Sequence, residues 1–238
     1  MLEKTRTRPP LRDTTPLKRL SAEWKKADDI DINEGIQAYF NYHKTMQAFA
    51  DHYGHNLDVV TAAFCALSPN SDYKGNLRSL ASVLDGINDG VNPGAITVST
   101  YNHCKDRAID YVLGRADFED KKRGLKILNF YRNILRPYDP KPVTIDGHMI
   151  ALHMGEELTM KEAKVSRRGY ERMAQDFREL AKRKGLLPNQ AQATLWFVRK
   201  RTRNIKYDSQ LQLFNGTGNA WETFTNPLST PPYVRKAI

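Results

Sequence analysis

Cysteine is scarce in this chain, since only Cys65 and Cys104 occur among 238 residues. Two thiols cannot build a disulfide framework or a four-cysteine metal or iron–sulfur site. Both cysteines lie inside apolar helical patterns, so we expect them to be small core side chains. No set of three metal ligands stands out either, and we therefore expect neither a metal nor a cofactor.

Long apolar runs are also missing. No stretch approaches the roughly 18 apolar residues that a membrane span requires. The first residues, MLEKTRTRPPLRD, lack the apolar core of a signal peptide. The sequence therefore predicts a cytoplasmic protein with no membrane partner.

Positive charge, in contrast, is abundant. Lysine and arginine number 37 against 27 aspartates and glutamates, which gives a formal net charge of +10. Such an excess favours a polyanionic partner, and nucleic acid is the first candidate. The alternative is a basic protein whose charged faces are simply solvated.

The pattern of apolar residues predicts an all-α fold, because helical spacing recurs along the chain and sustained period-two alternation is hard to find. We expect helices at 36–52, 58–67, 72 to about 84, 97–114, 121–135, 146–154, 160–184 and 188–203. The expected organisation is a flexible basic arm (1–16), a helical domain (17–207) and a C-terminal extension packed on it (208–238). The arm could follow phosphates or be a tail without a role.

The segment VTIDGHMIAL (143–152) carries the first candidate for chemistry. It places Asp146 at the start of an expected helix, where the dipole and free N–H groups favour an ionised carboxylate. A fixed carboxylate stabilises the positive charge that a sugar develops when its glycosidic bond breaks. The alternative is that Asp146 only caps the helix.

Four segments between about 57 and 205 resemble, in order, the endonuclease III-like, helix-hairpin-helix family of base-excision DNA glycosylases. The first is LDVVTAAFCALSPNSDYKGN, similar to an apolar helix ending in Leu-Ser-x-Gln, with Asp72 and Asn76 matching downstream supporting positions. Asn70 stands where the family has Gln. The resemblance implies that Asn70 fills the gap left by an extruded nucleotide, whereas a turn asparagine is the alternative reading.

The second and third segments are YNHCKDRAIDYVL (101–113) and RGLKILNFYRNIL (123–135). The former resembles a structural helix before the family's hairpin, and the latter resembles the start of the hairpin's second helix through Gly124, Lys126 and Asn129. Lys126 lies 20 residues before Asp146, close to the family's separation between its reactive lysine and catalytic aspartate. A surface lysine touching phosphate is the alternative.

The family's hairpin, Leu-Pro-Gly-Val-Gly, is not intact in this chain. Backbone N–H groups of that hairpin hold phosphate, so phosphate binding here is expected to depend on Lys121, Lys122 and Arg123 together with Gly124. This departure leaves open a protein that kept the fold and lost catalysis.

The fourth segment is VTIDGHMIAL itself, similar to the family's Val-Asp-x-His, with Asp146 and His148 matching and His148 expected as a structural partner. Downstream, PNQAQATLWFVRKRTRN resembles a late helix followed by basic residues. Those residues are expected to neutralise phosphates and are Arg199, Lys200, Arg201 and Arg203. Candidates for stacking on an extruded base are Tyr73, Tyr101, Tyr131 and Tyr170.

The resemblance implies a monomeric, nucleoid-associated DNA glycosylase of two helical lobes with a cleft between them. It would extrude a damaged or modified base and break its N-glycosidic bond through Asp146, with strand cleavage if Lys126 forms a Schiff base. The alternatives are a base-modifying transferase, similar to phage proteins that elaborate thymine, and a non-catalytic DNA-binding protein.

Overall fold

The structure, a computed structural model, describes residues 15–119, 124–159 and 162–205. Within these ranges the chain is all-helical and contains no strand, which confirms the expected fold class. Nine α-helices and one short 3₁₀ helix (Pro93–Ala95) are present in the described part. The α-helices are α1 (Thr15–Trp24), α2 (Asp29–Tyr53), α3 (Leu57–Leu67), α4 (Tyr73–Asn88), α5 (Asn102–Val112), α6 (Leu125–Leu135), α7 (Gly147–Met154), α8 (Arg167–Lys184) and α9 (Pro188–Thr202).

Local sequence signals set several of these helix ends. Asp28 and Asp31 form a capping box that starts α2 seven residues before the expected position. Asp72 caps α4 as expected, with its side chain accepting the backbone N–H of Gly75. Gly185 ends α8 in the left-handed conformation, which glycine adopts without a steric penalty.

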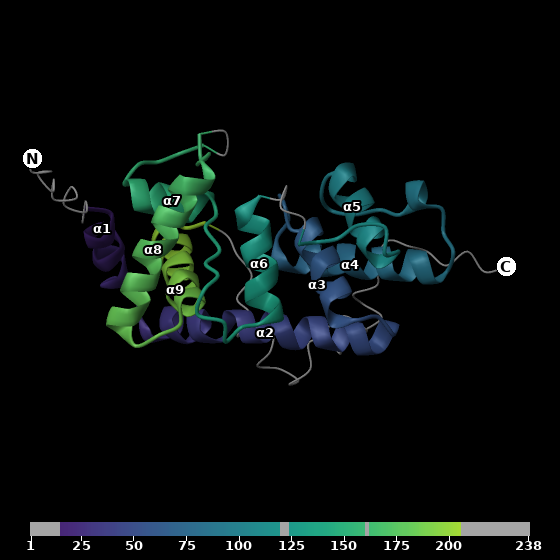
Figure 1. The fold of residues 1–238 in the computed structure, drawn as a ribbon, viewed down its shortest axis with the longest axis horizontal. Coiled ribbons are helices and arrows are strands. Elements are labelled where there is room, and N and C mark those ends of the chain that lie inside the picture. Colours follow the sequence, from purple (N-terminus) through teal and green to yellow (C-terminus); the bar gives the residue numbers. More distant parts are fainter. Residues whose placement is uncertain (1–14, 120–123, 160–161, 206–238) are drawn as a thin grey trace, which may run out of the picture.

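The buried apolar side chains form two clusters. The first is built mainly by α2, α3, α4, α5 and α6. The second is built by α1, α7, α8 and α9 together with Val143 and Ile145. Trp196 of α9 packs against both clusters, and α2 runs along the lower edge of the molecule beneath both groups of helices (Figure 1).

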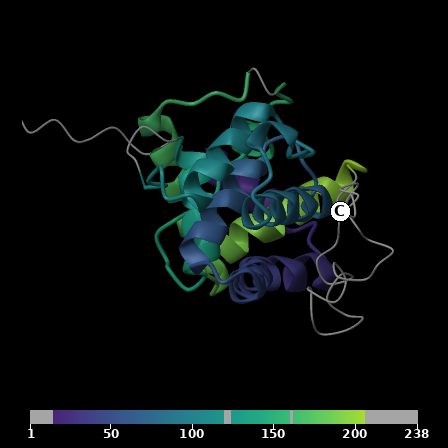
Figure 2. The ribbon, with the colours of Figure 1, turned by 90° about the vertical axis from the view of Figure 1, so that its right-hand side faces the viewer.

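Helices α2 and α9 lie against each other, and the view in Figure 2 shows α9 in yellow-green beside the purple-blue α2. Gly35 permits this approach. A Cβ at that position would lie 2.6 Å from the Cα of Thr194, so only hydrogen fits there. The N- and C-terminal parts of the described chain are thereby joined in one packed unit.

Other elements differ from expectation. Helix α1 was not expected, and it takes in Thr15 and Pro16 of the supposed arm. Residues 97–101 are not helical, because Ser99 is bonded to α4 through its N–H and the Ser79 hydroxyl oxygen, 2.9 Å apart. The rest of the expected arm and the whole of the expected C-terminal extension (208–238) fall outside the described residues. No described helix combines the length and apolarity of a transmembrane segment.

Candidate functional site

Asp146 is the N-cap of α7, and both of its carboxylate oxygens accept hydrogen bonds. Oδ1 accepts the backbone N–H of Met149 at 2.9 Å, and Oδ2 accepts the indole Nε1–H of Trp196 at 2.9 Å. The side chain is half-buried. The capping role is therefore real, and the second hydrogen bond, from α9, fixes the carboxylate beyond what a cap requires.

The segment that leads into Asp146 is held by one hydroxyl. Tyr170 of α8 donates to the carbonyl of Val143 at 2.8 Å and accepts the N–H of Ile145 at 2.9 Å. Asn129 of α6 also donates to this hydroxyl, at 3.3 Å. Burial raises the pKa of Tyr170 to about 12, so the phenol keeps its proton and its donor role at neutral pH.

An imidazole and cationic side chains surround the carboxylate. Burial lowers the pKa of His148, with Lys200, Arg199 and Lys126 adding to the effect and Asp146 opposing it. Because the ordinary value is 6.5, the imidazole is neutral at pH 7. Asp146, His148, Lys126 and Lys200 therefore share one neighbourhood, contributed by α6, α7 and α9.

Lys200 has an unusual setting for a lysine. Its Nζ lies 4.9 Å from the ring centroid of Trp196, the same indole that donates to Asp146. Burial lowers the pKa of Lys200, while Asp146 acts in the opposite direction. Desolvation therefore outweighs the nearby negative charge.

The arginines expected to contact phosphate are instead bonded to carboxylates of the chain itself. Arg199 is 4% exposed and lies 3.3 Å from a carboxylate oxygen of Glu157, which Arg203 also contacts. Arg201 pairs with the buried Asp31 of α2. These ion pairs give the three arginines a role in the fold, while the side chains of Arg201 and Arg203 remain 40% and 41% exposed.

The loop between α3 and α4 places the other matched residues away from α7. Asn70 is exposed in the left-handed region, with φ of 54°. Asn76 is buried and donates to the carbonyl of Phe64 at 3.2 Å, and Asp72 caps α4. The structure thus gives Asp72 and Asn76 supporting roles and leaves the Asn70 side chain at the surface.

Gly124 is the exposed N-cap of α6, where φ is −64° and no special glycine conformation is needed. Lys126 follows within the first turn and is half-buried. The basic run formed by Lys121, Lys122 and Arg123 lies outside the described residues.

The four tyrosines considered for stacking have different environments. Tyr131 and Tyr170 are buried, and Tyr73 is half-buried with its ring centroid 5.1 Å from that of Tyr42. Tyr101 is 51% exposed and stacks on His103 with an interplanar angle of 12°. Of the four, Tyr101 offers the most surface to a partner.

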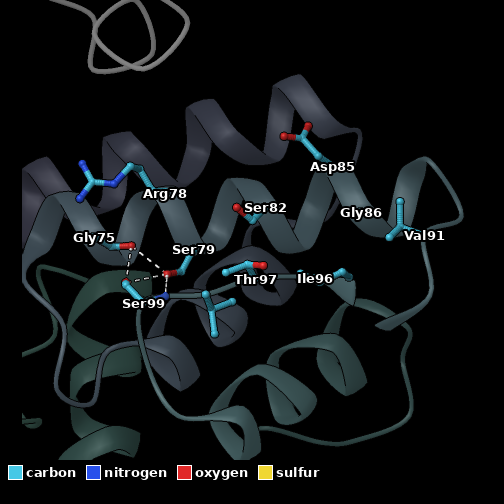
Figure 3. Close-up of a pocket in the computed structure, with 11 residues that line it drawn as sticks. Gly75, Arg78, Ser79, Ser82, Asp85, Gly86, Val91, Ile96, Thr97 and Ser99 are labelled. Atoms are coloured by element: carbon cyan, nitrogen blue, oxygen red, sulfur yellow. Dashed lines mark hydrogen bonds between the residues drawn. The ribbon is translucent and has the colours of Figure 1, made fainter. Parts of the chain in front are cut away.

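A cavity of about 370 Å³ lies elsewhere, between α4 and residues 91–99. Figure 3 shows Ser79 and Ser99 hydrogen-bonded along one wall, at 2.8 Å, with Arg78 and Asp85 farther apart on α4. A second cavity, of about 240 Å³, is lined by residues of α1, α7 and α9, including Arg19 and Arg199. Neither cavity includes Asp146, and no three potential metal-ligating side chains gather within the described residues.

Trp196 and the bonding of Tyr170 are the parts of the site that sequence reasoning missed. Trp196 is 50 residues from Asp146 in the chain, and nothing in either segment indicates that they meet. A general rule could have suggested such a bond, since an indole N–H that is partly buried needs a hydrogen-bond acceptor.

The described residues thus define an all-α protein with two apolar clusters and a carboxylate fixed among an imidazole and lysines at their junction. A family model matches residues 3–204, and the chain belongs to that family, described as a family of unknown function (DUF7178). No curated protein and no solved structure gives a significant match.

Proposed function

We propose that this chain is a DNA glycosylase-like enzyme that extrudes a damaged or modified base and cleaves its N-glycosidic bond with the help of Asp146. The observation that carries the proposal is the fixed carboxylate at the start of α7, hydrogen-bonded on both oxygens. The resemblance of the surrounding segments to helix-hairpin-helix glycosylases supplies the reaction class.

The chemistry asks for a negative charge that is already in place. As the bond from C1′ to the base breaks, the deoxyribose develops oxocarbenium-like positive charge, which an aimed carboxylate stabilises more in the transition state than in the ground state. Hydrogen bonds to both oxygens keep Asp146 from reorienting during the reaction. They suit an electrostatic role better than removal of a proton from water.

The remaining features are compatible with a DNA partner. Lys126 and Lys200 are close enough to His148 to lower its pKa, so cations are available beside the carboxylate for backbone phosphates. Asn70 and Tyr101 are exposed on neighbouring loops, where the Thr100 hydroxyl donates to the carbonyl of Pro69. An amide and an aromatic ring there could contact an opened duplex.

The test is Asp146→Asn, with duplex DNA containing natural, damaged and phage-type modified bases and detection of released bases by mass spectrometry. Asparagine remains a good N-cap, so the variant should fold while base release falls by about 10²–10³-fold or more. Asp72→Asn, which alters the comparable cap of α4, is the matched control and should release base normally.

Full activity in the Asp146→Asn variant would refute the assignment. DNA that gains mass without losing a base would favour the base-modifying transferase. Salt-sensitive binding with unchanged DNA would favour the non-catalytic alternative.

A further inference from the structure

Three arginines line the cavity of about 240 Å³ between α1, α7 and α9, which are neighbours in the fold (Figure 1). They are Arg19, Arg199 and Arg203. The lining also includes Gly155, the C-cap of α7, whereas Asp146 caps the opposite end of the same helix. The cavity is therefore separate from the carboxylate to which we assign base release.

Arg199 is the most deeply buried of the three arginines and is incompletely bonded. The residue is 4% exposed, and its Nε has no hydrogen-bond partner among the described residues. Both carboxylate oxygens of Glu157 lie 3.3 Å from one nitrogen, Nη2, whereas charge-assisted hydrogen bonds are about 2.7–2.9 Å long. A well-matched oxyanion would place one oxygen on Nε and another on Nη2. The contact with Glu157 thus leaves a buried donor unsatisfied, which costs free energy.

Glu157 is a loosely held partner at this position. Its side chain is 66% exposed, and exposed ion pairs contribute little to stability. The same carboxylate contacts Arg203, so two guanidinium groups share one negative charge. A phosphate group carries about −1.5 to −2 charges and three acceptor oxygens. Phosphate therefore matches this pair of arginines better than a carboxylate does.

The other charged groups around the cavity are compatible with a bound anion. Glu23 is paired with Lys26, with 2.6 Å between the amine and the carboxylate oxygen, and Glu156 is exposed to solvent. The carbonyl end of α7 would repel an anion, but Arg19 donates to the carbonyl of His153 in its last turn, at 3.1 Å. The negative groups other than Glu157 are thus paired with cations or in contact with water.

We propose that this cavity binds a phosphate group, either as inorganic phosphate or as the phosphate of a small monoester. Glu157 occupies the anion position in the structure and moves into solvent when phosphate enters. The phosphate oxygens then accept from Nε and Nη2 of Arg199 and from the guanidinium of Arg203. This inference goes beyond the proposed function and does not depend on it, because neither DNA nor Asp146 takes part.

Isothermal titration calorimetry of the full chain with inorganic phosphate, at constant pH and ionic strength, tests the site. The wild type should show saturable binding of one phosphate per chain. Glu157→Gln should bind phosphate about 2- to 5-fold more tightly, because the competing carboxylate is gone. Arg203→Gln should bind it at least about 10-fold more weakly, because a hydrogen bond between charged groups is lost. Both side chains are substantially exposed, so we expect the two variants to fold, and circular dichroism checks this.

Glu171→Gln is the matched control. Glu171 is 61% exposed and pairs with Arg178, and neither residue lines the cavity. Removal of this carboxylate also changes the net charge by one unit and breaks an exposed ion pair. The control should bind phosphate like the wild type.

A deoxynucleoside 5′-monophosphate and the corresponding deoxynucleoside distinguish the sources of the phosphate. Tighter binding of the monophosphate than of inorganic phosphate, with the same dependence on Arg203 and Glu157, would identify a phosphate ester as the ligand. Equal or weaker binding would identify free phosphate, and the deoxynucleoside should not bind. The proposal is wrong if the wild type shows no saturable phosphate binding, if Arg203→Gln binds like the wild type, or if Glu157→Gln binds no more tightly than Glu171→Gln.

Discussion

At the scale of single residues, Asp146 combines a helix cap with the catalytic role that we propose for it. Its Oδ1 satisfies an N–H at the start of α7, as in many helix caps. Its Oδ2 is bonded to an indole from another helix. The first hydrogen bond is the one that a helix cap forms. The second hydrogen bond fixes the orientation of the carboxylate group.

Trp196→Phe should separate these two contributions. Phenylalanine keeps an aromatic ring between the apolar clusters and removes the N–H donor. Because a hydrogen bond to a charged group contributes about 1.5–3 kcal/mol, we expect kcat for base release to fall about 10- to 100-fold with little change in KM.

Trp24→Phe is the control, since Trp24 is a buried indole that also has a lysine above its ring. Single-turnover and steady-state kinetics on the two variants would check the difference. Equal losses in both would mean that Trp196 acts only through packing.

Residue-scale prediction from the sequence succeeded where the signal was local. Asp72 and Asp146 were recognised at helix starts, and Cys65 and Cys104 are both buried as expected. The basic end of α9 was expected to face phosphate, yet Arg201 pairs with Asp31, 170 residues away. Such a partner is fixed by tertiary packing, which spacing along the chain does not encode.

At the scale of helices, the contact between α2 and α9 depends on the missing side chain at Gly35. A methyl group there would meet the backbone of α9 at Thr194, and backbone cannot rotate away as a side-chain tip can. The close approach positions α9, which carries Trp196 and Lys200, against α2.

Gly35→Ala should therefore destabilise the protein, although alanine normally favours helix by about 1 kcal/mol. We expect the free energy of unfolding to fall by about 2–4 kcal/mol, because overpacking must move a helix. Urea denaturation followed by circular dichroism would measure it.

Gly169→Ala in α8 provides the comparison, since its nearest new contact is the Ser166 hydroxyl oxygen at 3.3 Å. That variant should change stability by no more than about 1 kcal/mol in either direction. Similar losses in the two variants would show that the approach at Gly35 is not the cause.

Element prediction was most accurate for helices with clear caps or continuous apolar faces, such as α3 and α7. Helix α1 was missed because the segment is polar on average, although Leu17, Leu20 and Trp24 form a buried stripe. Residues 97–101 were expected as helix but are irregular, with Ser99 hydrogen-bonded to Ser79 of α4. In that segment, tertiary hydrogen bonds override the local tendency.

At the scale of the whole molecule, the net charge is +10, but the basic side chains are not all equally available to a polyanion. Arg201 is paired with Asp31, and Arg199 and Arg203 share the one carboxylate of Glu157, so part of their charge is already compensated. The lysines beside Asp146 are better placed to contribute to the DNA binding that we propose.

DNA affinity should fall linearly in a logarithmic plot against salt concentration. Lys126→Gln should reduce the slope by about 1 and leave stability nearly unchanged. Arg201→Gln should leave the slope as in the wild type and lower stability, because Asp31 would be left buried without its ion pair. Fluorescence anisotropy at several salt concentrations would measure the slopes, and urea melts would measure stability. A reduced slope for Arg201→Gln with unchanged stability would instead place Arg201 in contact with DNA.

Trp196 touches the apolar interior on both sides of the molecule and bonds to the carboxylate between them. The orientation of that carboxylate therefore depends on both apolar clusters and not on helix α7 alone. Any shift of one set of helices against the other would move the indole. The orientation of the carboxylate and the packing of the two apolar clusters against each other would therefore change together.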